Sequence, residues 1–559
     1  MGRPLRRALL LTLLVLAPAL HDAKAEAGGG VRRPRGIYTV IGIDGYIDVS
    51  VGRNPSITPA ELHAGLIGLY GNVLDNPAVS GLAIQMGWHR LNPNPPSSPQ
   101  AYDWSYLDDA FSSVSLWNAQ NPTMVPKTIM VSLFPGFWTP KWVLEQIPSC
   151  DGLFQSPSQT PPSDCGKFTY INFAEPHEGD VLPLPWNPVY KSSFRTFLVA
   201  FAAHCQANPA FVSMDVAGPT AATSEIIMPH TDVPDQTQFG GISANDMWLK
   251  LLPFAYPNQP AYQKSDQAFI DEWDAAVDMF GEVFSGVTLV VWHGSGLPDL
   301  GGTGFTIPSA FKDQCATPPS MDCAAEATIL SHLADPAAGG ANPKATSGAG
   351  LNGRARPTLN ILKWLSQSTA HFTSPSAQVL GGEQFGTGFS SAGIEFGCTR
   401  AFPPDSSDRP AGCSIPASCT TDACVSVACI PQACLAPGVT SASLAAAGYA
   451  EFGNVPAADL IPPEQSLYNA LKNYFDGTPA ASFFGGTTGT VPDNYLQIYS
   501  ADIDYAKAHV SAPAPVVEPD GTIVSMTAQD LLNLASQKLL EIAEPTTIFQ
   551  VRRHLPRGR

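Results

Sequence analysis

The stretch FVSMDVAGPTAATSEIIMPH, residues 211–230, joins a strand-like apolar run to a turn and an isolated carboxylate. The run extends through Val216, and Gly218 and Pro219 then break it. Glu225 follows among small and apolar neighbours, whereas surface carboxylates usually lie on polar faces with Lys and Arg. We therefore interpret the stretch as a buried strand whose end delivers Glu225 to a site.

Similar apolar runs recur from residue 37 onward and alternate with amphipathic helical stretches, a pattern typical of parallel strands buried by crossover helices. The runs span 37–43, 81–88, 127–134, 211–218, 287–293, 376–382 and 494–500. Helical spacing of apolar residues appears at 58–74, 190–206, 266–284 and 463–475. The first of these helices has Thr58 as its N-cap and Pro59 in its first turn.

This repetition predicts the α/β class and a (β/α)8 TIM barrel with long loop insertions. We expect the eighth strand between residues 345 and 362, where the pattern is weak. An open doubly wound sheet that binds a nucleotide is less favoured, because no glycine-rich phosphate fingerprint follows the first strand.

Composition limits the class of protein further. Of the 559 residues, 44% are hydrophobic and only 14% are charged, so the chain can bury a large core. The formal charge of −18 argues against a nucleic-acid partner, which would select stripes of Lys and Arg. The 53 Pro and 48 Gly residues predict many turns and long loops around one catalytic domain, which we place at 36–510. Residues 511–559 are expected to form a C-terminal helix and a basic tail.

The first 25 residues resemble a secretory signal peptide. Three arginines precede an apolar run from Ala8 to Leu20, and Ala23-Lys24-Ala25 supplies a small-residue cleavage site. The run is shorter than the roughly 20 residues that span a bilayer. We therefore expect a mature chain that begins near Glu26, is secreted or periplasmic, and has no membrane partner after cleavage.

The eleven cysteines fit an exported chain. Six of them crowd into a Pro/Ser/Ala-rich stretch, which we interpret as a disulfide-stapled insertion at about 398–434: Cys398, Cys413, Cys419, Cys424, Cys429 and Cys434. A zinc site fits less well, because the cluster contains no His and no CxxC pairs of a zinc ribbon. Spacing suggests local pairs Cys150–Cys165 and Cys315–Cys323, which leaves Cys205 as a free thiol on a helix.

Catalytic groups of such barrels come from the C-terminal ends of strands, and two glutamates occupy these positions. Glu225 follows the fourth expected strand, and Glu383 ends the seventh, beside Gly381 and Gly382. Retaining hydrolysis of a glycosidic bond needs two carboxyl groups roughly 5 to 5.5 Å apart. Each glutamate alone fits a capped or salt-bridged structural residue equally well, but the pair at matched strand ends favours catalysis.

Four stretches together resemble glycoside hydrolase clan A, especially family 42 galactosidase-like enzymes and their barrel relatives. They are VSGLAIQMGWHRLNP, then YDWSYLDDAFSSV with KTIMVSLFPGFWTPKWV, and NPVYKSSFRTFLVAFAAHCQANPAFVSMDVAGPTAATSE. The resemblance spans roughly residues 36–505, and its motifs are weak singly. It implies Glu225 as general acid/base and Glu383 as nucleophile. An asparagine usually precedes the acid in that clan, whereas Ser224 stands there in this chain.

Aromatic and polar residues near the expected strand ends support a sugar ligand, because pyranose rings pack on flat aromatic faces. We select Trp138 over Trp142, which we expect to face inward. Arg90 fits a structural ion pair equally well, and Asp103 is better explained as a helix start. The expected substrate-binding residues are Trp88, His89, Arg90, Trp138, Ser224, Trp292, His293, Tyr499 and Asp502.

The expected activity is therefore a retaining glycoside hydrolase with an oligo- or polysaccharide substrate and no cofactor. The weakly polar setting of Glu225 should keep it protonated, and Arg90 or Tyr499 should help Glu383 stay ionised. The alternative is a catalytically inactive carbohydrate-binding protein on the same barrel, which Ser224 keeps open. A metal-dependent hydrolase is disfavoured, because the sequence has no HExxH motif and no HxH after its first strand. Sugar, linkage and oligomeric state stay open.

Overall fold

The computed structural model describes most of the N-terminal half of the chain and parts of the C-terminal half. The described residues are 32, 34–155, 162–170, 180–229, 241–265, 267–284, 286–296, 298, 300, 345–350, 380–385, 413, 425–430, 435–462, 464, 465, 467, 468, 471, 493–518 and 521–541. The expected signal peptide at 1–25 lies outside them, as does most of the helix expected at 463–475.

The centre of the molecule is a curled sheet in which every pairing is parallel. Its order is β6-β3-β2-β1-β11-β10-β9-β8-β7, and β6 also pairs with β8. The strands are β1 (Gly36–Gly42), β2 (Val79–Gly87), β3 (Thr128–Phe134), β6 (Phe211–Asp215), β7 (Glu225–Ile227), β8 (Thr288–Gly296), β9 (Ala345–Gly350), β10 (Leu380–Phe385) and β11 (Asp493–Tyr499).

Alternate residues of six strands meet in a small cluster on the concave face of this sheet. The cluster contains Tyr38, Val40, Ala83, Met130, Val212, Val290 and Tyr495, with the partly buried Tyr499 packed against it. Their sequence neighbours, such as Leu82, Ile84 and Val131, belong instead to a much larger core on the other face. This period-two segregation shows that the sheet curls around its own inner side chains.

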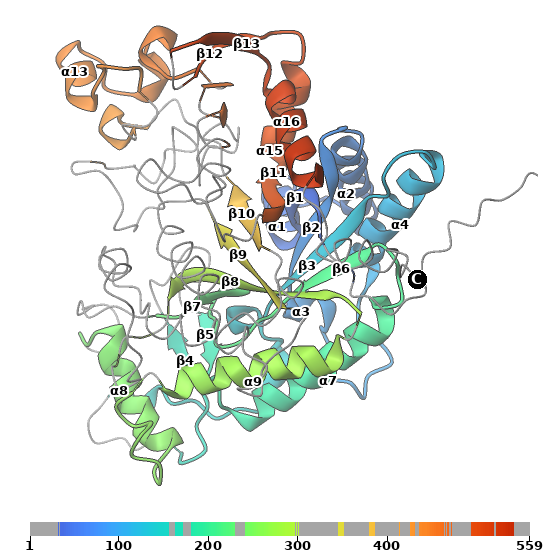
Figure 1. The fold of residues 1–559 in the computed structure, drawn as a ribbon. Helices are drawn as coiled ribbons and strands as arrows, with labels where there is room; N and C mark the ends of the chain where they lie inside the picture. Colours follow the sequence, from blue (N-terminus) through green and yellow to red (C-terminus); the bar gives the residue numbers. More distant parts are fainter. Residues whose placement is uncertain are drawn as a thin grey trace, which may run out of the picture.

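Helices cover the convex face, as Figure 1 shows. α7 and α9 lie side by side along one side of the sheet, and α2 packs against α4. α16 contacts β1 and β11. The helices are α1 (Ile43–Arg53), α2 (Pro59–Leu74), α3 (Trp88–Leu91), α4 (Ser105–Gln120), α5 (Lys141–Leu144), α6 (Gly152–Gln155), α7 (Pro188–Cys205), α8 (Ala244–Ala255), α9 (Gln267–Val283), α13 (Ser441–Ala446), α15 (Ser500–Ala508) and α16 (Ala528–Glu541).

The ends of these helices follow from local sequence. Thr58 caps α2 in a capping box, because its hydroxyl accepts the Glu61 N–H while the Glu61 carboxylate accepts the Thr58 N–H at 2.8 Å. Asn187 accepts two N–H groups in the first turn of α7. Asp103 accepts the Ser105 N–H where α4 begins, as expected for a helix start.

Smaller elements extend the fold. Two antiparallel pairs are β4 (Lys167–Tyr170) with β5 (Asp180–Pro183), and β12 (Ala514–Val517) with β13 (Ile523–Met526). The 3-10 helices are η1 (Gly136–Trp138), η5 (Val427–Cys429), η7 (Phe452–Asn454) and η8 (Ala457–Asp459). Near η5, Val427, Ile430, Leu435 and Leu444 form a separate small apolar cluster.

Most predicted strands and helices are confirmed. Each of the seven apolar runs overlaps a strand of the curled sheet, and β9 lies inside the interval 345–362. α2, α7 and α9 match the expected helices. Helices that would follow β9 and β10 lie outside the described residues, so the fold is established as a curled parallel α/β sheet.

The disulfide expectations are met where the structure describes the cysteines. Cys150 bonds to Cys165, and Cys413 bonds to Cys429 within the cysteine-rich stretch. Cys205 is a free, buried thiol on α7. The remaining cysteines of the cluster and the expected Cys315–Cys323 pair lie outside the described residues.

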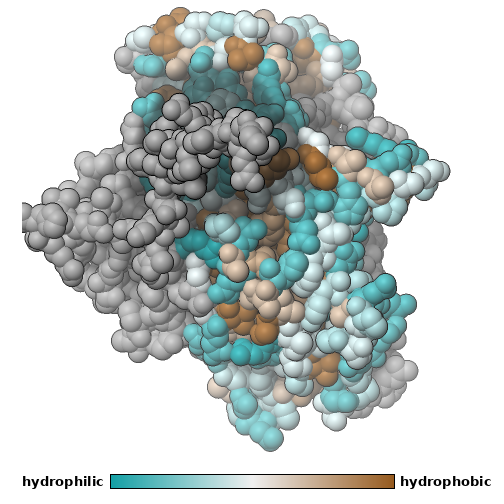
Figure 2. All heavy atoms as spheres, turned by 90° about the vertical axis from the view of Figure 1, so that its right-hand side faces the viewer, coloured by the Kyte–Doolittle hydropathy of each residue, from teal (hydrophilic) through white to brown (hydrophobic). Residues whose placement is uncertain are grey.

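The face shown in Figure 2 carries hydrophobic residues as small separate groups among hydrophilic ones. On the molecule as a whole, the exposed apolar side chains of the described residues include Ile67 of α2, Leu116 of α4 and Val199 of α7. Such scattered residues are ordinary on a protein surface. Within the described ranges, none of the helices has the length and apolar character needed to cross a bilayer.

Candidate active site

Asp44 lies at the start of α1, just beyond the end of β1, and only 4% of the residue is exposed. One carboxylate oxygen accepts the Gly87 N–H at 2.6 Å, and the other accepts the Arg90 Nε–H at 2.5 Å. The Arg90 guanidinium also lies 3.6 Å from the exposed Asp48 carboxylate. Asp44 thus fixes Arg90 where β1 and β2 end, which is the ion pair considered for Arg90 from sequence.

His89 and Trp138 form a stacked pair beside this carboxylate. Their ring centroids are 5.2 Å apart with an angle of 22° between the planes. His89 Nε2 lies 3.9 Å from Asp44 Oδ1, and 37% of the His89 side chain is exposed. Trp138 belongs to η1, which follows β3, so strand ends β1, β2 and β3 contribute to one cluster. This cluster offers an aromatic surface beside hydrogen-bonding groups.

Glu225 lies on β7, a three-residue strand that pairs with the C-terminal half of β8. Its register partner is Trp292, and Ile226 is paired with His293. Three of the residues expected at the site, Glu225, Trp292 and His293, are therefore brought together by their backbone positions. The preceding Ser224 is buried, with 2% of the residue exposed. The sequence predicted that Glu225 follows the fourth strand, but it did not predict that Glu225 itself belongs to a strand that pairs with β8.

Glu383 lies on β10, and its register partner is Gly350 of β9. The row of paired residues that starts at Glu225 runs through Trp292 and Gly348 to Gly381, two residues before Glu383. The backbone positions of Glu225 and Glu383 are fixed by these strand pairings. Both belong to the same curled sheet, with β8 and β9 between them.

Tyr499 and Asp502 lie where β11 ends. Tyr499 is the last residue of β11, pairs in register with Val40 of β1, and packs against the inner cluster. Asp502 is in the first turn of α15, and 4% of the residue is exposed. Tyr499 thus lies at the same end of the sheet as Asp44, whereas Asp502 is largely enclosed in its helix layer.

Trp88 does not support the expected role in sugar binding. The residue has no exposed surface and packs against Tyr190, Phe194 and Phe197 of α7. Its indole N–H donates to Asn92 at 3.2 Å. Because β2 ends at Gly87 and α3 begins immediately, the first residue after the strand enters the core rather than the strand-end cluster.

Trp138 and Trp142 differ as expected from sequence. Trp142 packs against the main core, and its indole N–H donates to the Asn92 carbonyl at 3.0 Å. Trp138 instead contacts His89 and donates its indole N–H to the Ala222 carbonyl at 2.8 Å. Only Trp138 of the two belongs to the strand-end cluster.

Asp44 is the residue that sequence reasoning missed. It follows the first apolar run in the segment Gly42-Ile43-Asp44, so the strand-end rule that selected Glu225 also selects it. The apolar neighbours of an acid at such a place are the available signal, as they were for Glu225.

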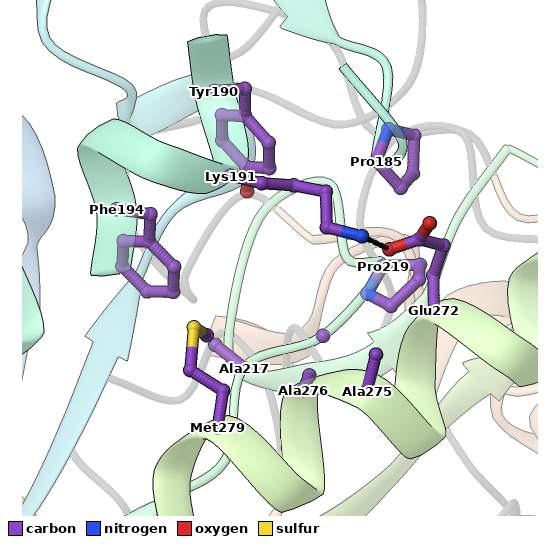
Figure 3. Close-up of a pocket in the computed structure, with 11 residues that line it drawn as sticks. Pro185, Tyr190, Lys191, Phe194, Ala217, Pro219, Glu272, Ala275, Ala276 and Met279 are labelled. Carbon is purple, nitrogen blue, oxygen red and sulfur yellow. Dashed lines mark hydrogen bonds and ion pairs between the residues drawn. The ribbon is translucent and has the colours of Figure 1, made fainter. Parts of the chain in front are cut away.

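A cavity of about 60 Å³ lies between α7 and α9, at the segment 217–219 (Figure 3). Lys191 and Glu272 form an ion pair at 2.5 Å across it, and the remaining lining is largely apolar. Burial raises the pKa of Glu272, and the Lys191 ammonium opposes this shift. The cavity lies between the helix layer and the segment that directly follows β6, and its two charged side chains neutralise each other.

Within the part of the chain that the structure describes, no group of three or more His, Cys, Asp or Glu side chains is arranged to hold a metal ion. The cluster at the ends of β1, β2 and β3 consists of the Asp44–Arg90 ion pair and the stacked His89–Trp138 pair. Such groups can orient a polar ligand and exchange protons with it.

No family model and no curated protein matches the chain. Solved structures that align with it include the catalytic core of xylanase A, at 9% identity over 91% of this chain and 99% of that one, with a TM-score of 0.37. Endo-glycoceramidase II from Rhodococcus sp. aligns at 12% identity over 63% and 66%, with a TM-score of 0.27.

A β-galactosidase from Marinomonas ef1 aligns at 10% identity over 56% of this chain, with a TM-score of 0.26. The chain spans 40% of the length of that enzyme. All three are enzymes of sugar-containing substrates by name, but TM-scores this low do not establish a shared fold. The case for a function therefore rests on the strand ends of this chain.

Proposed function

We propose that this protein is a retaining glycoside hydrolase in which Glu225 is the general acid/base and Glu383 is the nucleophile. The observation that supports the proposal best is that both glutamates belong to strands of one curled parallel sheet, with β8 and β9 between them. Glu225 is the first residue of β7, which pairs with the C-terminal half of β8, and such folds carry out their chemistry at the C-terminal ends of their strands.

The two carboxyl groups must come within roughly 5 to 5.5 Å for retention. On a flat sheet, three strand spacings of about 4.8 Å would separate the two backbones by roughly 14 Å. Curvature of the sheet shortens this span, and both side chains must then extend into the concave side. The mechanism thus makes a definite geometric demand on Glu225 and Glu383.

The strand-end cluster supports a carbohydrate substrate. Trp138 and His89 provide an aromatic surface, and Arg90 is held beside it by the buried Asp44. Pyranose rings combine apolar C–H faces with hydroxyl rims, so flat rings next to charged hydrogen-bonding groups suit them. Tyr499 is the nearest polar aromatic residue of β11 to the same end of β1.

A complete (β/α)8 barrel is part of the proposal. The parallel pairing β6–β8 supports it, because it joins the edge strand β6 to β8 and so links the two ends of the run β6-β3-β2-β1-β11-β10-β9-β8. Export is also part of it. The Cys150–Cys165 and Cys413–Cys429 disulfides support export, since disulfides persist mainly in oxidising compartments.

A panel of nitrophenyl glycosides tests the proposal with three variants. Glu383→Gln should abolish turnover, whereas Glu225→Ala should slow substrates with poor leaving groups far more than activated aryl glycosides. Azide should rescue Glu225→Ala by replacing the water that the missing base activates. Glu145→Gln, at an exposed position on the C-terminal side of α5, is the matched control and should behave as wild type.

Near-normal turnover by both Glu383→Gln and Glu225→Ala would refute this pair. An experimental structure in which the two carboxyl groups lie more than roughly 10 Å apart would also refute this pair. Sugar binding by the wild type without any turnover would favour the inactive carbohydrate-binding protein instead, for which the buried Ser224 before Glu225 is the relevant departure.

A further inference from the structure

The segment from Val216 to Pro229, which carries Glu225, runs from β6 to just beyond β7 and is largely buried. Val216, Ala217, Thr220, Ala221 and Ser224 are each at most 3% exposed. Between the two strands it has no regular structure, so its carbonyl groups cannot be satisfied by a helix or a ladder. Buried carbonyl groups of this kind need donors from elsewhere in the fold.

Three tryptophan side chains supply such donors. The indole N–H of Trp273 on α9 donates to the Pro219 carbonyl at 3.1 Å, and that of Trp138 in η1 donates to the Ala222 carbonyl at 2.8 Å. Beyond β7, the indole N–H of Trp248 on α8 donates to the Pro229 carbonyl at 2.7 Å. These hydrogen bonds come from three separate elements and lie on both sides of Glu225.

The contact between η1 and the segment is especially close. The Phe137 N–H donates to the Ala221 carbonyl at 2.7 Å. Gly136 faces the same carbonyl, and a Cβ at Gly136 would lie 1.8 Å from that oxygen. Only a residue without a side chain allows this approach. The turn after β3 is thus fitted to residues 220–222.

We propose that Trp138, together with Trp248 and Trp273, is a positioning residue that fixes the backbone around Glu225. This inference rests on the proposed acid/base role of Glu225. Trp248 and Trp273 have no exposed surface and serve the core as well, whereas Trp138 is only partly buried. Trp138 also stacks on His89, so it connects the segment of Glu225 to the cluster at the ends of β1 and β2.

The test is Trp138→Phe, which keeps an aromatic ring against His89 but removes the donor to Ala222. The matched control is Trp142→Phe, because Trp142 is also partly buried and also donates its indole N–H to a backbone carbonyl, that of Asn92. Amide hydrogen exchange between residues 220 and 228 should become about 5- to 10-fold faster in Trp138→Phe and stay unchanged in the control.

The dependence of kcat/KM on the leaving group is a measurement that a purely structural role of Trp138 would not change. For the sugar that the wild type cleaves, Trp138→Phe should lower kcat/KM about 10- to 100-fold on the methyl glycoside. The loss on the dinitrophenyl glycoside should be within about 3-fold, because that leaving group needs little protonation. Trp142→Phe should affect both substrates alike.

The exchange and kinetic measurements can overturn the proposal in three ways. Unchanged exchange in Trp138→Phe would overturn the proposed role of the hydrogen bond in holding the segment. Faster exchange with equal losses on both glycosides would overturn the positioning role while leaving the glutamate pair intact. If Glu225→Ala itself showed no dependence on the leaving group, the acid/base assignment would fail, and the positioning role would fail with it.

Discussion

The unfolding free energy of the wild type should gain a contribution from Lys127 as the pH rises above about 8. Replacing Lys127 by methionine should remove this contribution. Lys127 directly precedes β3 and is 4% exposed. Its ammonium donates to the carbonyls of Asn76 at 3.0 Å and Val79 at 2.7 Å, and it lies 4.3 Å from the centre of the Trp117 ring. Burial lowers the pKa of Lys127 from 10.5 to about 8, and the Asp75 charge opposes this shift.

The sign follows from proton binding. Because the folded-state pKa of Lys127 is below its unfolded value, the unfolded chain binds more protons between pH 8 and pH 10.5. The cost of burying the charge is therefore fully present below pH 8, and it disappears as the pH rises through 10.5. A shift from 10.5 to about 8 corresponds to about 3 kcal/mol of unfolding free energy.

Urea unfolding of wild type, Lys127→Met and Lys141→Met at several pH values from 7 to 11 measures this. The difference between wild type and Lys127→Met should grow by about 3 kcal/mol in favour of wild type over that range. Lys141 has 88% of its side chain exposed, so Lys141→Met should follow the wild-type profile. Groups common to all three proteins, including tyrosines, cancel in the differences. Parallel profiles for wild type and Lys127→Met would refute the buried-charge account.

Two further predictions concern charged groups that hold chain segments together. Arg32→Met removes guanidinium hydrogen bonds to the carbonyls of Gln206, Asn208 and Gly286. It should lower the unfolding free energy measured in urea by about 2 kcal/mol. A loss below about 0.5 kcal/mol would contradict this prediction. Asp44→Ala leaves the Gly87 N–H and the Arg90 Nε–H without their acceptor and should lower the unfolding free energy by about 1 to 3 kcal/mol. Asp48 is exposed, so the control Asp48→Ala should change it by at most about 0.5 kcal/mol. Equal losses for the two variants in the same urea titration would argue against a special role for Asp44.

The strands β1, β2, β3 and β6 were predictable because each is a short apolar run with both faces largely buried. The run at 127–134, for example, coincides with β3 almost residue for residue. The capping box at Thr58 likewise fixes the start of α2 from local chemistry alone. Features of this kind depend on neighbours in the sequence, which is why one sequence is enough to find them.

The pairing of β7 with β8 was not predictable, since three residues show no periodicity. The fate of Trp88 was also beyond the pattern. The chain changes from strand to helix directly after Gly87, and the direction of the next side chain depends on that tertiary turn. The indole hydrogen bonds to Pro219, Ala222 and Pro229 join residues distant in sequence, so no local signal marks them.

The pairing of β1 with β11 has a consequence for how the chain is made. Gly36 pairs with Tyr495, so one edge of β1 stays unpaired until a strand far along the chain has been made. Closing so long a loop costs conformational entropy before any contact is gained. Until β11 is available, that edge presents unpaired N–H and C=O groups of the kind that join to other chains. The hazard of aggregation at this edge therefore lasts until the chain has been synthesised as far as β11.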